Sequence, residues 1–218
     1  EKQIFAIGMH GPQRFKLSSS DEGGGLEQST WQLLEGVYGQ DLHRSPHLIE
    51  TKGARELIDV LAVDREGACL FETKALAVLD KESARPLERQ AKNVAKDIKK
   101  ATKQLVGAIK ATRSGRIVKT ARGVIIDVSL GGDLCSHAVV LISALDFDLD
   151  WVHVRELLVE AFKQTGACFH VLDLHELRTM MAVASTPEQV REILQQRFVC
   201  LLDAKDAKFR LRLPPSRE

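Results

Sequence analysis

The sequence has no large excess of either charge. Lysines and arginines number 31 against 30 aspartates and glutamates, for a formal net charge of +1 over 218 residues. This balance excludes a protein that is basic over its whole surface, but it leaves room for a local basic patch. The sequence also lacks an apolar run near the roughly 18 residues that a membrane span requires, so we expect no membrane partner.

Cysteine and aromatic residues are few. Only four cysteines occur, and they form neither a CxxC motif nor a Cys/His cluster: Cys69, Cys135, Cys168 and Cys200. The spacing excludes a structural zinc site and a disulfide framework, and it is typical of thiols in the reducing cytoplasm. Aromatic residues make up 5% of the chain, too few and too scattered to predict a platform for stacked bases. The three glycines at 23–25 lack the GK[ST] sequence of a phosphate-binding loop.

What the sequence does contain is enough apolar material, 44% of all residues, to fill one substantial α/β domain. The first residue is Glu1 and not a methionine, so we expect a shortened chain or a piece of a longer protein. We predict a weakly packed lead-in over 1–25 that holds a short hairpin, a core over 26–130, and an α/β extension over 131–218 that packs on the core.

Periodicity of the apolar residues places the main elements. Steps of three and four predict helices, and continuous or alternating apolar runs predict strands. The expected helices are 26–38, 86–113, 151–165 and 185–198, and the expected strands are 47–51, 56–63, 68–76, 121–130, 137–145 and 168–173. We expect 56–63 and 68–76 to form an antiparallel hairpin, with Gly67 at a positive φ in its loop.

This hairpin carries charges where a strand core needs apolar side chains. Asp59 follows Ile58, and the segment LFETKAL (70–76) places Glu72 and Lys74 on one face of its strand. Paired near the middle of the hairpin, Asp59 and Glu72 would repel by roughly 4 kcal/mol at a separation of about 4 Å. A divalent cation would relieve the repulsion. Hard oxygen ligands without nearby cysteine or paired histidine favour Mg²⁺ or Mn²⁺.

Asp59, twelve further residues and then Glu72-Thr73-Lys74 resemble the signature of the PD-(D/E)xK nuclease superfamily. The resemblance covers about half of the chain. It implies an α/β fold with an αβββαβ restriction-endonuclease-like core, in which helices flank a mixed central sheet, followed here by the C-terminal extension. One departure is that Ile58 occupies the place of the family's proline.

The resemblance also implies roles for individual residues. Asp59 and Glu72 would be metal ligands, as would the backbone carbonyl of Thr73, and Lys74 would act beside the attacking water. Glu27, near the start of the first helix, resembles an additional acid of the metal site. Gln104 resembles a glutamine in the subgroups of Holliday junction resolvases, Mrr-type enzymes and nuclease-related domains, but an ordinary boundary residue of the helix is an equal alternative.

The long helix over 86–113 has a lysine-rich face opposite its apolar stripe. A solvated face is the usual explanation for such a pattern. Beside a phosphodiesterase site, the same lysines are candidates for phosphate contacts. The candidate nucleic-acid-binding residues are Lys96, Lys99, Lys100 and Lys103.

From these features we predict a Mg²⁺- or Mn²⁺-dependent nuclease that hydrolyses DNA with an activated water, an endonuclease in restriction, defence or repair. The sequence does not distinguish DNA from RNA, and a homodimer or a larger system with further domains or subunits is compatible with it. Two alternatives stay open. One is a non-catalytic nucleic-acid-binding or scaffold module that retains the fold, and the other is an enzyme acting on small phosphate esters.

Overall fold

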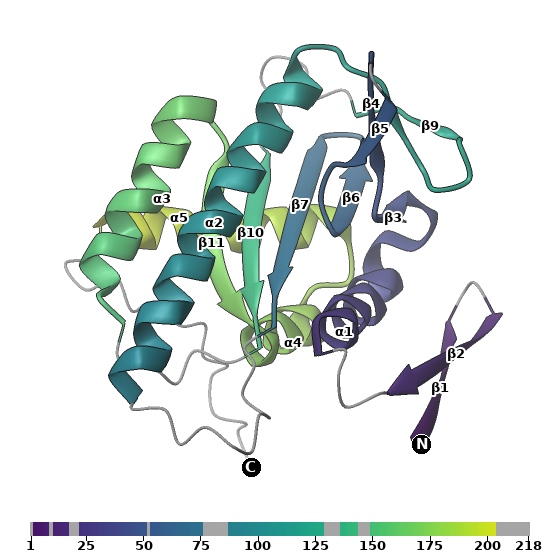
Figure 1. Cartoon of the computed structure of the whole chain (residues 1–218), viewed down its shortest axis with the longest axis horizontal. Helices are drawn as coiled ribbons and strands as arrows, with labels where there is room; N and C mark the ends of the chain where they lie inside the picture. The colour runs from purple at the N-terminus through teal and green to yellow at the C-terminus, as the bar shows by residue number, and fades with distance from the viewer. Residues whose placement is uncertain are drawn as a thin grey trace.

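The computed structural model describes residues 2–8, 11–17, 22–51, 53–75, 87–128, 136–143 and 149–203. Its centre is a mixed sheet of five strands flanked by helices, as expected for the α/β class (Figure 1). The strand order is β11-β10-β7-β6-β3. These strands are β3 (Leu42–Arg44), β6 (Val60–Asp64), β7 (Gly67–Lys74), β10 (His137–Ile142) and β11 (Cys168–Asp173).

The direction of the strands changes in the middle of the sheet. Strands β3, β6 and β7 form an antiparallel meander, whereas β10 is parallel to β7 and β11 is parallel to β10. Parallel neighbours need long crossover connections, and helices supply them here. These helices are α2 (Leu87–Arg113), between β7 and β10, and α3 (Trp151–Thr165), between β10 and β11.

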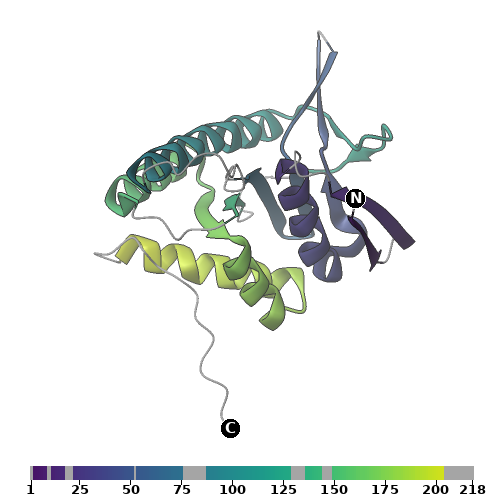
Figure 2. The same cartoon turned by 60° about the horizontal axis from the view of Figure 1, so that its bottom comes forward.

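The helices form a layer on each face of the sheet. On one face α2 packs with α3, and their apolar sides bury Ile98, Leu105 and Leu158 in a hydrophobic core against the sheet. On the other face lie α1 (Glu22–Tyr38), α4 (Leu174–Val183) and α5 (Pro187–Asp203), as Figure 2 shows. No helix in the described ranges has the length and apolar character needed to cross a membrane.

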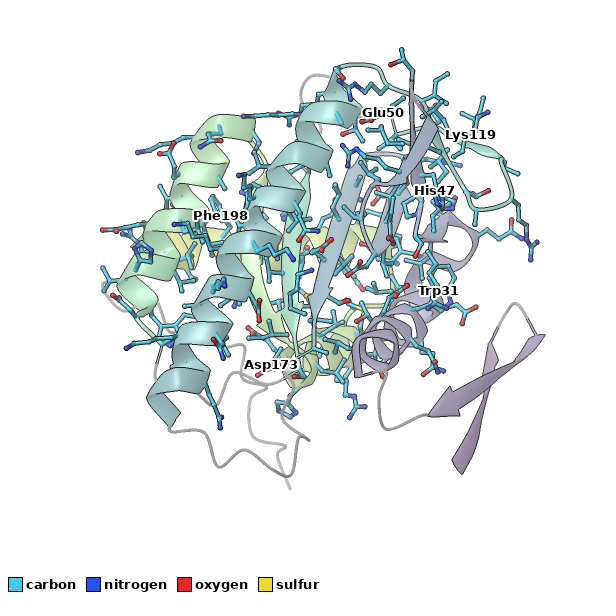
Figure 3. The ribbon with its side chains drawn as sticks, viewed as in Figure 1. Trp31, His47, Glu50, Lys119, Asp173 and Phe198 are labelled. Atoms are coloured by element: carbon cyan, nitrogen blue, oxygen red, sulfur yellow. The ribbon has the colours of Figure 1, made fainter. Side chains whose placement is uncertain are left out.

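A second, smaller sheet rises from one edge of the molecule (Figures 1 and 2). Its order is β5-β4-β8-β9, and every neighbouring pair is antiparallel. The strands are β4 (His47–Glu50), β5 (Gly53–Glu56), β8 (Val118–Lys119) and β9 (Ile125–Ile126). Figure 3 labels His47 and Lys119, which are cross-strand partners in this sheet.

Several expected elements differ from the structure. The strand expected over 56–63 is interrupted, because β5 ends at Glu56, the chain bends at Asp59 and β6 begins at Val60. Only Ile125–Ile126 of the expected strand 121–130 is a strand among the described residues, and it belongs to the small sheet. The short helix α4 was not expected. The ends of the strands expected over 68–76 and 137–145 lie partly outside the described residues, at residue 76 and at 144–145.

The loop between β6 and β7 also forms differently from the prediction. Gly67 pairs with Asp64 within the ladder and is not among the residues with positive φ. Instead, Oδ1 of Asp64 accepts a hydrogen bond from the backbone N–H of Glu66 at 2.8 Å. An aspartate side chain that binds the backbone two residues later makes an Asx-turn, which closes the hairpin without a positive-φ glycine.

The expected limit at residue 130 does not separate two sheets. Residues after it supply β10 and β11, and β10 pairs directly with β7. At the other end, the expected lead-in 1–25 contains the two-stranded hairpin of β1 (Lys2–Gly8) and β2 (Gly11–Leu17), together with the first turn of α1.

Candidate active site

The open end of the β6–β7 hairpin brings Asp59 and Glu72 together. The ladder pairs Asp64 with Gly67 and ends with Val60 opposite Phe71. Asp59 precedes Val60 and Glu72 follows Phe71, so both acids lie just beyond the last pair. The prediction placed them near the middle of the hairpin. That placement is wrong, because the chain bends at Asp59 and β6 begins only at Val60, so the ladder with β7 does not reach the two acids.

Beyond the last backbone pair of the β6–β7 ladder, the Asp59 carboxylate takes the place of a backbone acceptor for β7. Its Oδ2 accepts a hydrogen bond from the backbone N–H of Thr73 at 2.6 Å and another from the Thr73 hydroxyl at 2.7 Å. The Asp59 carbonyl accepts a further bond from the backbone N–H of Ser45 at 2.8 Å. Asp59 is therefore fixed by β7 through its side chain and by the β3–β4 connection through its backbone.

Glu72 is almost completely enclosed, with 3% of its surface exposed. Alternate residues of a strand share a face, so Glu72 lies on the same face as Leu70, toward α2. Lys74 lies on that face too, and its Nζ donates a hydrogen bond to Oε1 of Glu72 at 2.6 Å. This contact confirms the predicted side-by-side placement of Glu72 and Lys74. The Lys74 side chain is 21% exposed, so the pair leads from the interior toward solvent.

The pKa of Glu72 is set by its burial and by the charges around it. Burial raises this pKa above its ordinary value, and the negative charge of Asp59 raises it further. The hydrogen bond and the charge of Lys74 lower it, while Glu56 at the end of β5 raises it again. The net direction is upward, so one lysine does not offset burial together with the acids around Glu72. A second positive charge would favour the ionised carboxylate.

Glu27 lies beside the hairpin but makes a different contact from the expected one. Its Oε1 accepts a hydrogen bond from Nε of Arg44 at 2.6 Å and one from the hydroxyl of Ser45 at 3.4 Å. Glu27 therefore holds the β3–β4 connection, the segment that also binds the Asp59 carbonyl. Its participation in a metal site stays a prediction.

Gln104 lies on the exposed side of α2 and makes no hydrogen bond with another described residue. The structure thus gives it no contact with Asp59, Glu72 or Lys74, and its auxiliary role stays a prediction. The four candidate lysines of α2, Lys96, Lys99, Lys100 and Lys103, are all exposed. They lie on the side opposite the buried Ile98 and Leu105, as the helical spacing predicts.

Three contributors to the site were not recognised in the sequence. The Thr73 hydroxyl binds Asp59, Arg44 pairs with Glu27, and the charge of Glu56 acts on Glu72. The hairpin register could have indicated Thr73. Extended by one residue, it places Asp59 opposite Glu72, so the next residue of β7, Thr73, is close enough to bond the Asp59 side chain. Arg44 and Glu56 depend on the paths of β3 and β5, which local sequence does not specify.

The donor set can be tested against a metal ion. Within the described ranges, no three His, Cys, Asp or Glu side chains gather closely enough to hold one. Mg²⁺, however, is commonly bound by one or two carboxylates together with waters and substrate phosphates. Hydrogen bonds among the described residues use Oδ2 of Asp59 and Oε1 of Glu72, so the second oxygen of each carboxylate is the available donor. A hard cation bound by this pair would therefore need water and substrate to complete its ligand set, and the metal site stays a prediction.

Comparisons with known proteins identify no relative of this chain. The chain matches no protein-family model, no curated protein and no solved structure.

Proposed function

We propose that the protein is a metal-dependent nuclease of the PD-(D/E)xK type that hydrolyses phosphodiester bonds in DNA. One observation carries the proposal: buried Glu72 accepts a hydrogen bond from Lys74, and its pKa is raised first by burial and then by the charge of Asp59. Two acids and a lysine at the end of one hairpin form an expensive arrangement in a fold that needs only apolar contacts there. Groups with perturbed pKa values concentrate at functional sites, which supports a chemical role.

Asp59 and Glu72 would hold a Mg²⁺ or Mn²⁺ ion, with the Thr73 carbonyl as a further oxygen donor. When bound, such an ion polarises a phosphodiester and lowers the pKa of water. The two hydrogen bonds from Thr73 orient the Asp59 carboxylate and leave its second oxygen for the ion. A ligand fixed in this way by neighbouring groups loses little freedom when the ion binds.

Lys74 would act on both the carboxylate and the substrate. Its ammonium lowers the pKa of Glu72 and so favours the ionised form that a cation needs. Because Lys74 is partly exposed, the same ammonium can neutralise charge that develops on a phosphate during hydrolysis. When the strands of the small sheet are left aside, the order α1, β3, β6, β7, α2, β10 follows the helix, three-strand, helix, strand order of the proposed family and supports the assignment.

The exposed lysines of α2 would bind the phosphate backbone of the substrate. They follow directly after the motif strand in the chain, and α2 packs on the same face of the sheet that bears Glu72. Contacts of this kind position nucleic acid without reading its sequence.

The test is cleavage of supercoiled plasmid with Mg²⁺ or Mn²⁺. Wild type should nick the plasmid, EDTA should stop the reaction, and Lys74→Ala should be inactive. Lys163→Ala, which changes an exposed lysine of α3, is the matched control and should cleave like wild type. A wild-type protein that binds plasmid without cutting it would instead identify a binding module that retains the fold. Cleavage that survives Lys74→Ala would contradict the assigned role of this lysine.

A further inference from the structure

Charge is strongly segregated along part of the chain. Residues 98–126 contain no aspartate or glutamate, although the protein as a whole is almost neutral. The same stretch contains eight cationic residues: Lys99, Lys100, Lys103, Lys110, Arg113, Arg116, Lys119 and Arg122. It begins on α2 and ends on the ribbon of β8 and β9, so the basic character continues beyond the helix onto the small sheet.

The β8–β9 ribbon, residues 116–126, has a tight turn at its tip. Lys119 pairs with Ile125 across the ribbon. In the turn, Thr120 donates its backbone N–H to the Val124 carbonyl at 2.8 Å, and Gly123 donates its own to the Thr120 carbonyl at 2.9 Å. Gly123 has φ +82°, a conformation that favours glycine. The turn therefore presents exposed Arg122 at the end of the ribbon.

The outer face of the ribbon is unexpectedly apolar. Val118 and Ile126 face the core and are 2% and 7% exposed. Their neighbours Ile117 and Ile125, on the opposite face, are 49% and 64% exposed, and Val124 at the turn is 63% exposed. A strand with one buried face normally alternates apolar with polar residues, so these side chains depart from the pattern of a solvated face. Exposed apolar groups that gather with charges commonly mark an interaction surface.

Two cations of the ribbon have no ionic partner in the described parts of the chain. Arg116 pairs with Glu50 at 3.2 Å, and Glu50 also receives Arg55 at 2.9 Å. Lys119 and Arg122 form no salt bridge with a described residue. The ribbon thus offers uncompensated positive charge beside apolar side chains.

We infer that the β8–β9 ribbon docks in a groove of double-helical nucleic acid. Arg122 and Lys119 contact phosphates at the rim, and Ile125 with Val124 faces the base edges. Strand β8 also pairs with β4, so the part that enters the groove is the tip of the ribbon, the turn over 120–124, together with the outer strand β9. A two-stranded tip of this kind has the width that the major groove admits. A second copy of the chain is a poorer occupant, because a two-fold contact would place this acid-free segment against itself, and like charges oppose association. The inference rests on the proposed function for its choice of ligand, and it specifies a duplex rather than a single strand.

The experiment measures binding and needs no catalysis. Fluorescence anisotropy in EDTA compares a labelled duplex with the same label on a single strand, over a series of salt concentrations. The charge variant is Arg122→Gln, and its matched control is Arg178→Gln, which removes an exposed arginine from α4 on the other side of the sheet. The apolar variant is Ile125→Ser. Thermal unfolding of each variant verifies that it folds.

We expect Arg122→Gln to weaken duplex binding by about fivefold to tenfold at 0.1 M salt and to reduce the slope of log K against log salt by about 0.9. Arg178→Gln should bind like wild type. Ile125→Ser should weaken duplex binding more than single-strand binding, because only the duplex has a groove.

Equal affinities for Arg122→Gln and Arg178→Gln would overturn the inference. So would loss of a dimer in Ile125→Ser, seen by sedimentation, with nucleic-acid binding unchanged, since the ribbon would then be a contact between copies. These results are distinct from failure of the nuclease proposal. A protein that shows the ribbon effect but never cleaves would retain the groove contact and lose only the catalytic assignment.

Discussion

Substitution of Asp59 should separate the structural role of its carboxylate from its catalytic role. In Asp59→Ala, the backbone N–H and the hydroxyl of Thr73 both lose their acceptor. Thr73 is 9% exposed, so water replaces these bonds only in part. A hydrogen bond to a charged group contributes about 1.5–3 kcal/mol. Because Asp59 is itself partly exposed and its removal relieves repulsion on Glu72, we take the lower limit for each bond, a total loss of about 3 kcal/mol.

For a chain of 150–250 residues, each 1 kcal/mol changes Tm by about 2–4 °C, so Asp59→Ala should unfold about 6–12 °C below wild type. Asp59→Asn keeps a carbonyl acceptor and should unfold close to the wild-type temperature, while losing cleavage because the carboxylate charge is gone. Thr73→Val removes only the hydroxyl bond and should cost about 1.5 kcal/mol. The assay is thermal unfolding followed by circular dichroism, with plasmid cleavage measured in parallel. Asp59→Ala with the Tm of wild type would refute the structural role.

Three further predictions concern other charged groups. Burial, with the charges of His137 and Arg197, holds the pKa of His170 well below its usual range, whereas the unfolded chain binds this proton near pH 6.5. Stability should therefore be complete above about pH 6.5 and fall as the pH drops below it, and urea midpoints over this range should depend less on pH in His170→Gln. Arg197 and Glu176 form a buried ion pair at 2.9 Å. Because Arg197→Met leaves the Glu176 charge buried without its partner, it should lower the free energy of unfolding by about 3–5 kcal/mol in urea titrations. Adding Glu176→Leu removes that charge and should restore much of the loss. Replacing the four candidate lysines of α2 by glutamine should reduce the salt slope of duplex binding by about 3.6 if each contacts one phosphate, and an unchanged slope would leave these lysines as a solvated face.

The sequence predicts best where one residue pattern has one physical solution. The stripe of Ile98, Leu105 and their neighbours predicts α2 almost to its ends, since that spacing buries apolar side chains only as a helix. The ends of α3 follow from residues that cap helices, Asp150 at the start and Gly166 at the end. The Asp150 side chain accepts a hydrogen bond from the backbone N–H of His153 at 3.0 Å, and Gly166 has φ +68°.

Prediction is weaker where the position of a strand depends on the strand with which it pairs. The apolar run after Arg122 reads as a buried sheet strand, but Val124 and Ile125 are exposed, whereas Ile126 reaches the core. The run over 56–63 is mostly apolar and predicts one strand, but the chain bends at Asp59, where bonds join this residue to Ser45 and Thr73, which are distant in sequence.

The candidate site illustrates the same division. The same-face contact of Glu72 and Lys74 follows from the alternation of any strand, so the sequence suffices for it. The ion pair of Glu27 with Arg44 requires α1 to lie beside β3, an arrangement of helix and sheet that local patterns do not contain.

The central claim is that Asp59 and Glu72 jointly bind a divalent cation. Its most direct test is a crystal structure grown with Mn²⁺, in which anomalous scattering locates the ion. We predict one strong peak in contact with both carboxylates in the wild type, and no peak there in Glu72→Gln. Manganese peaks found only elsewhere on the wild-type protein would contradict the claim.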